Sequence, residues 1–180
     1  MYNLLPLSLA TIALWAPHAL AVKYTISNNC GQPINLFANG INQGNLAVGE
    51  VTTREYANDW SGALYTDANG GDGLTGQRTT RAGFHNDGDY YYIVIDTERL
   101  NTGVRIEPLV PVVRCSASFI PPFMFSRVRQ QNNDFCTSAM CDNKACSSVL
   151  RAPPEIFPAP SSSPPAPPIR ACPGNDVGYK

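Results

Sequence analysis

The sequence predicts an all-β protein, and three observations support that prediction. Tyr90–Ile95 is a run of six β-favouring residues preceded by the turn-forming sequence N-D-G-D at Asn86–Asp89, which is typical of a buried strand. Thr102–Pro108 alternates apolar with charged side chains, as a strand buried on one face does. Between residues 22 and 113 no segment has 3.6-residue periodicity. Many short strands separated by turns indicate an antiparallel sandwich or barrel.

The first 21 residues are expected to be a signal peptide. Leu4–Trp15 is apolar, and Ala19–Ala21 has the small-x-small pattern of a signal peptidase site, which predicts cleavage before Val22. The apolar stretch is too short to span a membrane and is interrupted by prolines. We therefore expect a secreted protein, without stable membrane insertion, that forms one domain over residues 22–180.

The first part of this domain, residues 22–114, is expected to hold the β core. A turn at Asn58–Asp59 leads into Trp60–Tyr65, and Leu46–Val48 is a short segment between glycines. Ala68–Gly76 is a glycine-rich loop that lacks the lysine and serine partners of a phosphate-binding loop, so we expect a surface loop. Further strands are expected at Lys23–Asn28, Pro33–Ala38, Val51–Tyr56 and Arg78–Phe84.

The second part, residues 115–180, is rich in cysteine and proline. Its low-complexity segment Ala152–Pro168 cannot join the interior of a sheet because proline lacks the N–H donor, so a polyproline-like coil or mobile loop is expected. An even number of cysteines in an exported chain indicates disulfides. Six cysteines allow 15 pairings, so the connectivity stays open. The disulfide candidates are Cys30, Cys115, Cys136, Cys141, Cys146 and Cys172.

The charge pattern argues against a nucleic-acid partner. The net charge is −1, and the chain has no basic patch of the density that phosphate backbones require. Charged residues make up 15% of the chain, well below the usual quarter, so uncharged polar residues must supply much of the surface. That composition suits an extracellular protein.

Nucleophilic and metal chemistry have little support in the sequence. His85 is the only histidine after residue 21, and no G-x-S-x-G or other nucleophile motif accompanies it. The cysteines lack the C-x2-C spacing of a zinc site. We therefore expect His85 to be a solvated turn residue, and we expect no metal and no cofactor.

Paired carboxylates are the remaining route to catalysis. Asp87 with Asp89, and Asp96 with Glu98, are each two residues apart and would share a face in an extended strand. That spacing spans about 6.5–7 Å, within the roughly 5–9.5 Å that glycoside hydrolysis requires. Because acidic residues beside turns are mostly solvated, the spacing permits a hydrolase without indicating one.

Tyrosines are the candidate groups for stacking on sugar rings. In a strand only alternate side chains share a face, so Tyr91 points inward if Tyr90 and Tyr92 point outward. At least half of the tyrosine cluster is therefore expected in the core. The cluster comprises Tyr56, Tyr65, Tyr90, Tyr91 and Tyr92.

Five segments, in this order, resemble the thaumatin-like family, which includes thaumatin, osmotin and related pathogenesis-related proteins. The likeness is closest from Tyr24 to Pro108. The resemblance implies a β-sandwich with a loop-rich, disulfide-held flank, secretion, binding to cell-wall glucan, antifungal or stress roles and, in some members, weak endo-β-1,3-glucanase activity. The matching segments are Y-T-I-S-N-N-C at Tyr24–Cys30, W-S-G-A-L-Y at Trp60–Tyr65, A-G-F at Ala82–Phe84, G-D-Y-Y-Y at Gly88–Tyr92, and Leu100-Asn101 followed by Ile106–Pro108.

The departures from the family bear on function. The family's acidic cleft has an arginine at the position of Ala63, a glutamate at that of Gly83 and an aspartate at that of Tyr92. Loss of both carboxylates removes the acid together with the nucleophile or base, so hydrolysis by the family mechanism is not expected. The family also closes on an F-C-P strand whose cysteine bonds the first one. Here either Cys172 pairs with Cys30, or the chain continues past Lys180.

We therefore expect a secreted, non-catalytic, monomeric protein that binds cell-wall β-glucan or acts in defence at a cell surface. Tyr65, Asp89, Tyr92 and Asp96 are the expected carbohydrate-binding residues. One alternative is a weak endo-β-1,3-glucanase that uses residual carboxylates such as Asp89 and Asp96. Another is a structural or interaction protein that acts through the Pro/Ser-rich loop Ala152–Pro168.

Overall fold

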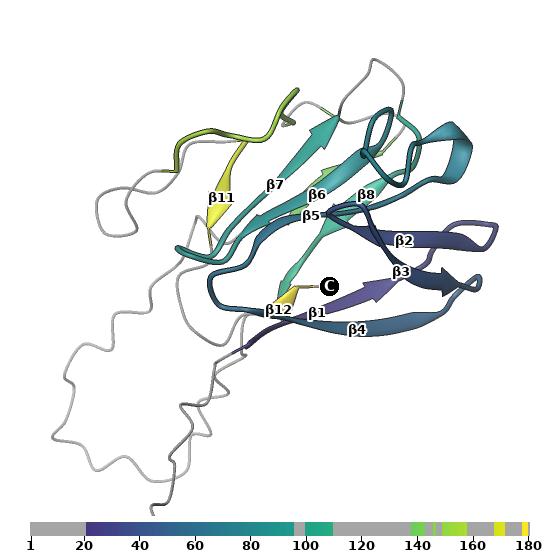
Figure 1. The fold of residues 1–180 in the computed structure, drawn as a ribbon, viewed down its shortest axis with the longest axis horizontal. Helices are drawn as coiled ribbons and strands as arrows, with labels where there is room; N and C mark the ends of the chain where they lie inside the picture. The colour runs from purple at the N-terminus through teal and green to yellow at the C-terminus, as the bar shows by residue number, and fades with distance from the viewer. Residues whose placement is uncertain are drawn as a thin grey trace, which may run out of the picture.

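The computed structural model describes residues 21–95, 100–109, 138–142, 146, 149–157, 168–171 and 178–179. These residues form β-strands in sheets of six, four and two strands, with one 3₁₀ turn, η1 (Ala68–Gly70), and no α-helix among them (Figure 1). The all-β prediction is confirmed. The strands are β1 (Ala21–Ser27), β2 (Ile34–Ala38), β3 (Ile41–Leu46), β4 (Val51–Ala57), β5 (Ser61–Thr66), β6 (Thr80–His85), β7 (Tyr90–Ile95), β8 (Val104–Ile106), β9 (Pro108–Leu109), β10 (Ala139–Cys141), β11 (Arg170–Ala171) and β12 (Gly178–Tyr179).

The six-stranded sheet has the order β11-β7-β6-β5-β2-β3, and all its neighbours are antiparallel. β6 and β7 pair along their whole length, from Thr80 with Ile95 to His85 with Tyr90. The predicted turn joins them, and Gly88 and Asp89 adopt φ angles of 100° and 56° that tight turns require.

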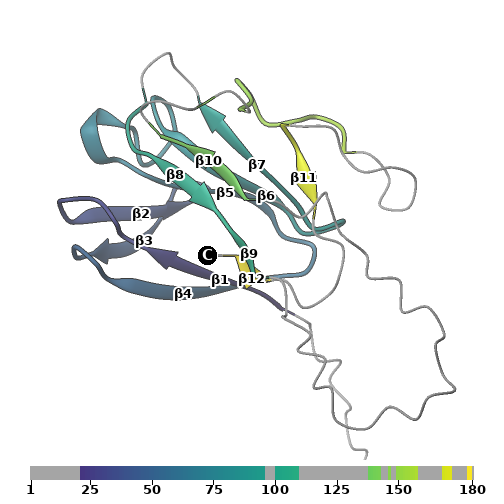
Figure 2. The ribbon, with the colours of Figure 1, turned by 180° about the vertical axis from the view of Figure 1, so that it is seen from behind.

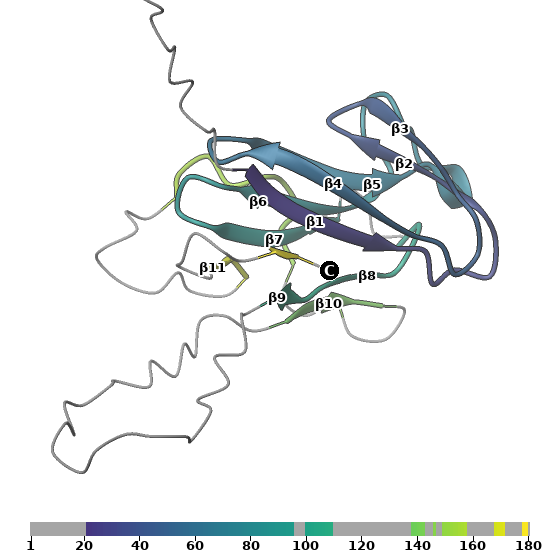
Figure 3. The same cartoon turned by 90° about the horizontal axis from the view of Figure 1, so that it is seen from below.

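The four-stranded sheet has the order β4-β1-β12-β9. β1 pairs with β4 over all seven residues, and its first residue, Ala21, is the last residue of the predicted signal peptide. β12 is parallel to β1, with Tyr179 opposite Tyr24, and antiparallel to β9. Figures 2 and 3 show β1 and β4 running across one face of the six-stranded sheet.

An aromatic cluster fills the space between these two sheets. Tyr24 of β1 is 1% exposed, and its ring centroid lies 4.7 Å from Phe84 of β6 and 5.7 Å from Trp60, both edge-on. Such pairs each contribute roughly 0.5–1.5 kcal/mol beyond the area that they bury. The Tyr24 hydroxyl donates a hydrogen bond to Asn86 Oδ1, and the Asn86 amide donates to the Ala57 carbonyl at 2.7 Å. The only polar group of the Tyr24 side chain is thus paired.

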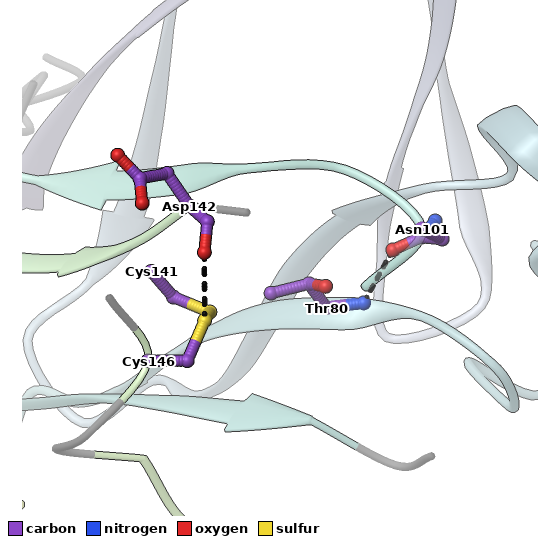
Figure 4. The surroundings of a disulfide bond; sticks show 5 residues. All are labelled: Thr80, Asn101, Cys141, Asp142 and Cys146. Atoms are coloured by element: carbon purple, nitrogen blue, oxygen red, sulfur yellow. Dashed lines mark hydrogen bonds between the residues drawn. A yellow bond between two sulfur atoms is a disulfide. The ribbon is translucent and has the colours of Figure 1, made fainter. Parts of the chain in front are cut away.

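Buried asparagines fix the loops around this core. The Asn28 amide donates to the Leu46 carbonyl at 3.0 Å, which ties the end of β1 to β3. Asn101 Oδ1 accepts the Thr80 N–H at 2.6 Å, as Figure 4 shows, and its amide donates to the Thr66 carbonyl at 2.9 Å. Buried backbone groups that lack a strand partner are satisfied in this way.

One disulfide, Cys141–Cys146, is present in the described part of the chain (Figure 4). Cys141 is fully buried in β10, which pairs with β8. Cys30 forms no disulfide with another described cysteine, and its suggested partner Cys172 lies outside the described residues, so that pairing stays a prediction. Apart from Cys30, the described cysteines are bonded to each other, so none of them can pair with it. The remaining candidates, Cys115, Cys136 and Cys172, lie outside the described residues.

Several strands differ from the sequence-based expectation, among them β11, which was not predicted. β3 covers Ile41–Leu46, where only the short segment Leu46–Val48 was expected. Its pairing with β2 shifts register between Leu36 and Phe37, and Gly44 has a φ of 112°, so the strand has no regular alternation to detect. β10 lies in the cysteine-rich part and was not predicted. In the described part of the chain, no helix is long and apolar enough to cross a membrane.

Candidate binding groove

The outer face of the six-stranded sheet, opposite the aromatic core, holds the candidate site. Because side chains alternate along a strand, the residues on either side of core-facing Leu64, Ala82 and Tyr91 point to this face. These outer-face side chains are Ser61, Ala63 and Tyr65 of β5, Arg81, Gly83 and His85 of β6, and Tyr90, Tyr92 and Val94 of β7.

Gly83 of β6 and Tyr92 of β7 lie directly opposite each other on neighbouring strands and pack together. A Cβ atom at residue 83 would overlap the Tyr92 ring, so the ring lies directly over the glycine. The two positions at which the resemblance places carboxylates are therefore coupled. With the Tyr92 ring in its observed position, residue 83 has no room for a side chain.

A segment of the proline-rich region covers one end of this face. Leu150 N–H donates to the Ile93 carbonyl at 2.8 Å and the Leu150 carbonyl accepts the Ile95 N–H at 3.0 Å, which anchors the segment to the edge of β7. The Phe157 ring then stacks on His85, with centroids 4.2 Å apart and an interplanar angle of 2°. It also lies 5.2 Å from Tyr90 and 5.9 Å from Tyr92.

The glycine-rich loop covers the other end. The Tyr65 hydroxyl donates to the Gly73 carbonyl at 3.0 Å, and Gly73 lies against the Phe37 ring, where a Cβ atom could not fit. Asp72 Oδ1 accepts the N–H groups of Thr75 and Leu74, and these bonds lower the pKa of the Asp72 carboxyl. The loop is therefore folded against the sheet, although its tip at Leu74 is 78% exposed.

A groove of about 360 Å³ lies between the two covers, which is within the usual size range of a small-ligand site. Aromatic and proline side chains form part of its walls, and Arg81 supplies a cationic hydrogen-bond donor. No carboxylate is among the described residues that line it. Burial raises the pKa of the Tyr92 and Tyr65 hydroxyls, so at neutral pH both act as neutral hydrogen-bonding groups. The lining residues are Asn39, Ser61, Gly62, Ala63, Tyr65, Leu74, Thr75, Arg81, Tyr92, Val94, Pro153, Pro154 and Phe157.

Ser61 and His85 form a hydrogen bond at the rim of the groove. His85 Nδ1 lies 2.9 Å from Ser61 Oγ, on neighbouring strands. His85 was expected to be a solvated turn residue. The structure instead places it at the end of β6, half-buried, with one ring face against Phe157. The hydrogen bond orients the imidazole for that stacking.

The structure brings two of the four predicted sugar-binding residues together. Tyr65 and Tyr92 both line the groove, but they are only 6% and 5% exposed, so little of either ring is available for stacking on a sugar. Asp89 lies in the turn between β6 and β7 and is not part of the lining. Asp96 lies outside the described residues. The expected inward position of Tyr91 is observed, since it is fully buried in the core.

Arg81 and Phe157 are groove residues that were not predicted. The alternation of β6 placed Arg81 on the same face as Gly83, so the pattern contained that signal. Phe157 lies in a proline-rich segment without periodicity, and nothing in its sequence indicated which surface it would cover. In the described part of the chain, no group of three or more His, Cys, Asp or Glu side chains is arranged to hold a metal ion.

Comparisons with protein-family models, with curated proteins and with solved structures found no match to this chain.

Proposed function

We propose that the chain is a secreted thaumatin-like protein that binds cell-wall β-glucan in the outer-face groove without hydrolysing it. The observation that supports this most is the position of the groove. It contains Ala63 and Tyr92, and Tyr92 covers Gly83, so the groove coincides with the three positions that the resemblance assigns to the family's cleft. The assignment of these three positions rests on the order of the matching motifs along the chain.

We also propose that the domain is a β-sandwich with a disulfide-held flank. The two larger sheets, with Tyr24 between them, form the two layers of a β-sandwich, and the disulfide-held, proline-rich flank corresponds to the segments that follow β9. The Cys141–Cys146 disulfide and the Leu150 contacts with β7 support this assignment because both tie that flank to the sheets. Secretion is part of the same proposal, and a disulfide is consistent with it.

The chemistry of the groove suits a neutral sugar. Glucan hydroxyls need hydrogen-bonding groups, which Arg81, Asn39 and Thr75 offer, and the apolar faces of the sugar rings need flat apolar surfaces, which Phe157 and the prolines offer. Hydrolysis needs two carboxyl groups roughly 5–9.5 Å apart across the substrate. Because the described lining has none, the groove supports binding rather than cleavage.

Sedimentation with insoluble β-1,3-glucan tests the proposal. We expect the wild-type protein to sediment with the polymer and the Arg81→Ala variant to lose most of this binding. Lys23→Ala is the matched control because it removes an exposed cation from β1, in the other sheet. Failure of the wild-type protein to bind β-glucan or any other wall polymer would refute the binding proposal.

Release of reducing sugar from laminarin tests the hydrolase alternative. Release that is lost in Asp89→Asn or Asp96→Asn would favour an enzyme and contradict the non-catalytic proposal. Retention on cells but not on purified glucan, lost when residues 158–167 are replaced by a Gly/Ser linker, would favour the interaction alternative. This replacement keeps Phe157 and therefore leaves the groove intact.

A further inference from the structure

The turn between β2 and β3 places an asparagine side chain at the outer-face groove. Asn39 and Gly40 have φ angles of 48° and 83°, as the two central residues of a type I′ turn do. Asparagine and glycine adopt positive φ more readily than other residues, so the sequence Asn-Gly favours this turn. Asn39 is exposed and is among the residues that line the groove.

The Asn39 amide takes the place of backbone groups where β2 ends. β2 pairs with β5 as far as Ala38, which lies opposite Leu64. Beyond that pair, Asn39 Oδ1 accepts the Ala63 N–H at 2.8 Å, and Asn39 Nδ2 donates to the Ser61 carbonyl at 3.3 Å. Because a backbone N–H can only donate and a carbonyl can only accept, these two partners fix which way the amide points.

Gly62 leaves the room that this arrangement needs. A Cβ atom at residue 62 would lie 2.3 Å from Asn39 Nδ2 and 2.4 Å from Asn39 Oδ1, closer than such atoms can approach. A larger residue at position 62 would therefore push the amide away from its partners on β5. Gly62 thus positions Asn39, although it has no side chain of its own to offer a ligand.

The amide keeps hydrogen-bonding capacity for a ligand. An asparagine side chain has two N–H donors and two acceptor lone pairs, and the bonds of Asn39 to β5 use one of each. One N–H and one lone pair therefore remain on an exposed group at the groove. Since the orientation of the amide is already fixed, it loses little rotamer entropy when a ligand binds.

We infer that Asn39 is a specificity-determining residue of the groove, which binds two neighbouring hydroxyl groups of a sugar. One hydroxyl donates to Oδ1, and the other accepts from Nδ2. Arg81, the cationic donor in the groove, cannot replace this contact because a guanidinium has no acceptor. The inference rests on the proposed glucan binding and adds to it the group that recognises the hydroxyls.

Calorimetric titration with laminarihexaose tests this role in the wild type, Asn39→Ala, Gly62→Ala and the double variant. Each single substitution is expected to weaken binding about tenfold, because one removes the amide and the other displaces it. The double variant should bind no more weakly than either single variant, since both changes remove the same contact.

Asn42→Ala is the matched control and should bind laminarihexaose as the wild type does. Asn42 is an exposed asparagine of β3 that also bonds to the backbone, since its Oδ1 accepts the Gly44 N–H at 2.7 Å. It is not part of the groove lining. The control therefore separates the loss of a backbone contact on this hairpin from the loss of a ligand contact.

The side-chain amide signals of Asn39 in ¹H–¹⁵N NMR spectra give a direct readout on the wild-type protein. They can be assigned through their proximity to the Ala63 N–H. Both signals are expected to shift on addition of laminarihexaose, whereas those of Asn42 stay in place. A purely structural role of Asn39 would lower the stability of the variants without this shift in the wild type.

The outcomes separate this inference from the proposed function. Absence of laminarihexaose binding by the wild type would overturn both. Binding by the wild type with unchanged affinity in Asn39→Ala, or with unshifted Asn39 signals, would overturn this inference alone. Additive losses in the double variant would overturn the positioning role of Gly62. The NMR measurement on the wild-type protein decides the role of Asn39 even if Gly62→Ala does not fold.

Discussion

The two faces of the six-stranded sheet each carry an aromatic cluster, and the clusters are built differently. On the inner face, Tyr24 packs against Phe84 of β6 and against Trp60, which directly precedes β5, and its hydroxyl is paired with Asn86. On the outer face, Phe157 covers His85 and Tyr92 from a segment without regular structure. The inner cluster joins two sheets, whereas the outer cluster is a cover attached to one. We therefore expect the inner cluster to contribute more to stability than the outer cover does.

The largest expected effect is at the centre of the inner cluster. Tyr24→Ala should lower the free energy of unfolding by about 4 kcal/mol, because it leaves a cavity between the sheets. It also leaves the Asn86 carbonyl without its hydroxyl donor. Urea denaturation followed by circular dichroism measures the change. A loss below about 1 kcal/mol would mean that the sheets do not depend on this contact.

At residue 83, packing against the Tyr92 ring limits the size of the side chain that this face of the sheet can hold. Gly83→Ala should cost roughly 1–3 kcal/mol, because the new methyl group overlaps the Tyr92 ring. In a Tyr92→Ala background the same substitution should cost much less, since the ring is gone. A double-mutant cycle with urea denaturation measures this coupling. Additive costs would show that the two side chains do not exclude each other.

Alkaline pH should weaken the inner cluster. Burial raises the pKa of Tyr24 above its usual value of 10, so the folded state retains a proton that the unfolded chain loses. Stability is therefore fully present below about pH 10 and falls as the pH rises further, at about 1.4 kcal/mol per pH unit for this one group. Tyr24→Phe is the control, and it should reduce the slope. An unchanged slope in that variant would assign the loss to other groups.

The smallest expected effect on stability is at the outer cover. Phe157→Ala should cost about 1–2 kcal/mol, less than a fully buried core aromatic, because Phe157 is half-buried and contacts a single sheet. It should also lower the pKa of Tyr92 toward 10, because the ring that contributes to its burial is removed. Spectrophotometric titration of tyrosinate measures that shift. A pKa that stays as high as in the wild type would mean that Phe157 does not shield Tyr92.

The sequence predicted the fold best where a strand has a clear pattern, either a continuous apolar run or a regular alternation. β7, the turn before it and the pairing region of β1 were all expected. For β7 the reason is that a run of aromatic and β-branched residues directly after the turn sequence N-D-G-D is typical of a strand. β3 was missed because a bulge and Gly44 break its alternation, and β10 because its three residues, Ala139–Cys141, lie in a polar, cysteine-rich stretch without alternating apolar and charged side chains.

The candidate site could be predicted only in part, for a different reason. The alternation of β5, β6 and β7 places Tyr65 and Tyr92 on one face, and this was visible in the sequence. Their burial was not, because it comes from segments that are remote in the chain or lack periodicity, the loop at Gly73 and the segment ending at Phe157. A tertiary contact from an irregular segment has no local sequence signal.

Calorimetric titration of the wild-type protein with laminarihexaose tests the role of the outer-face groove most directly. We predict saturable binding that is weakened at least about tenfold in Arg81→Ala and unchanged in Lys23→Ala. Equal affinity of the wild type and Arg81→Ala would place the glucan elsewhere on the molecule, and no heat of binding for the wild type would contradict the proposed function.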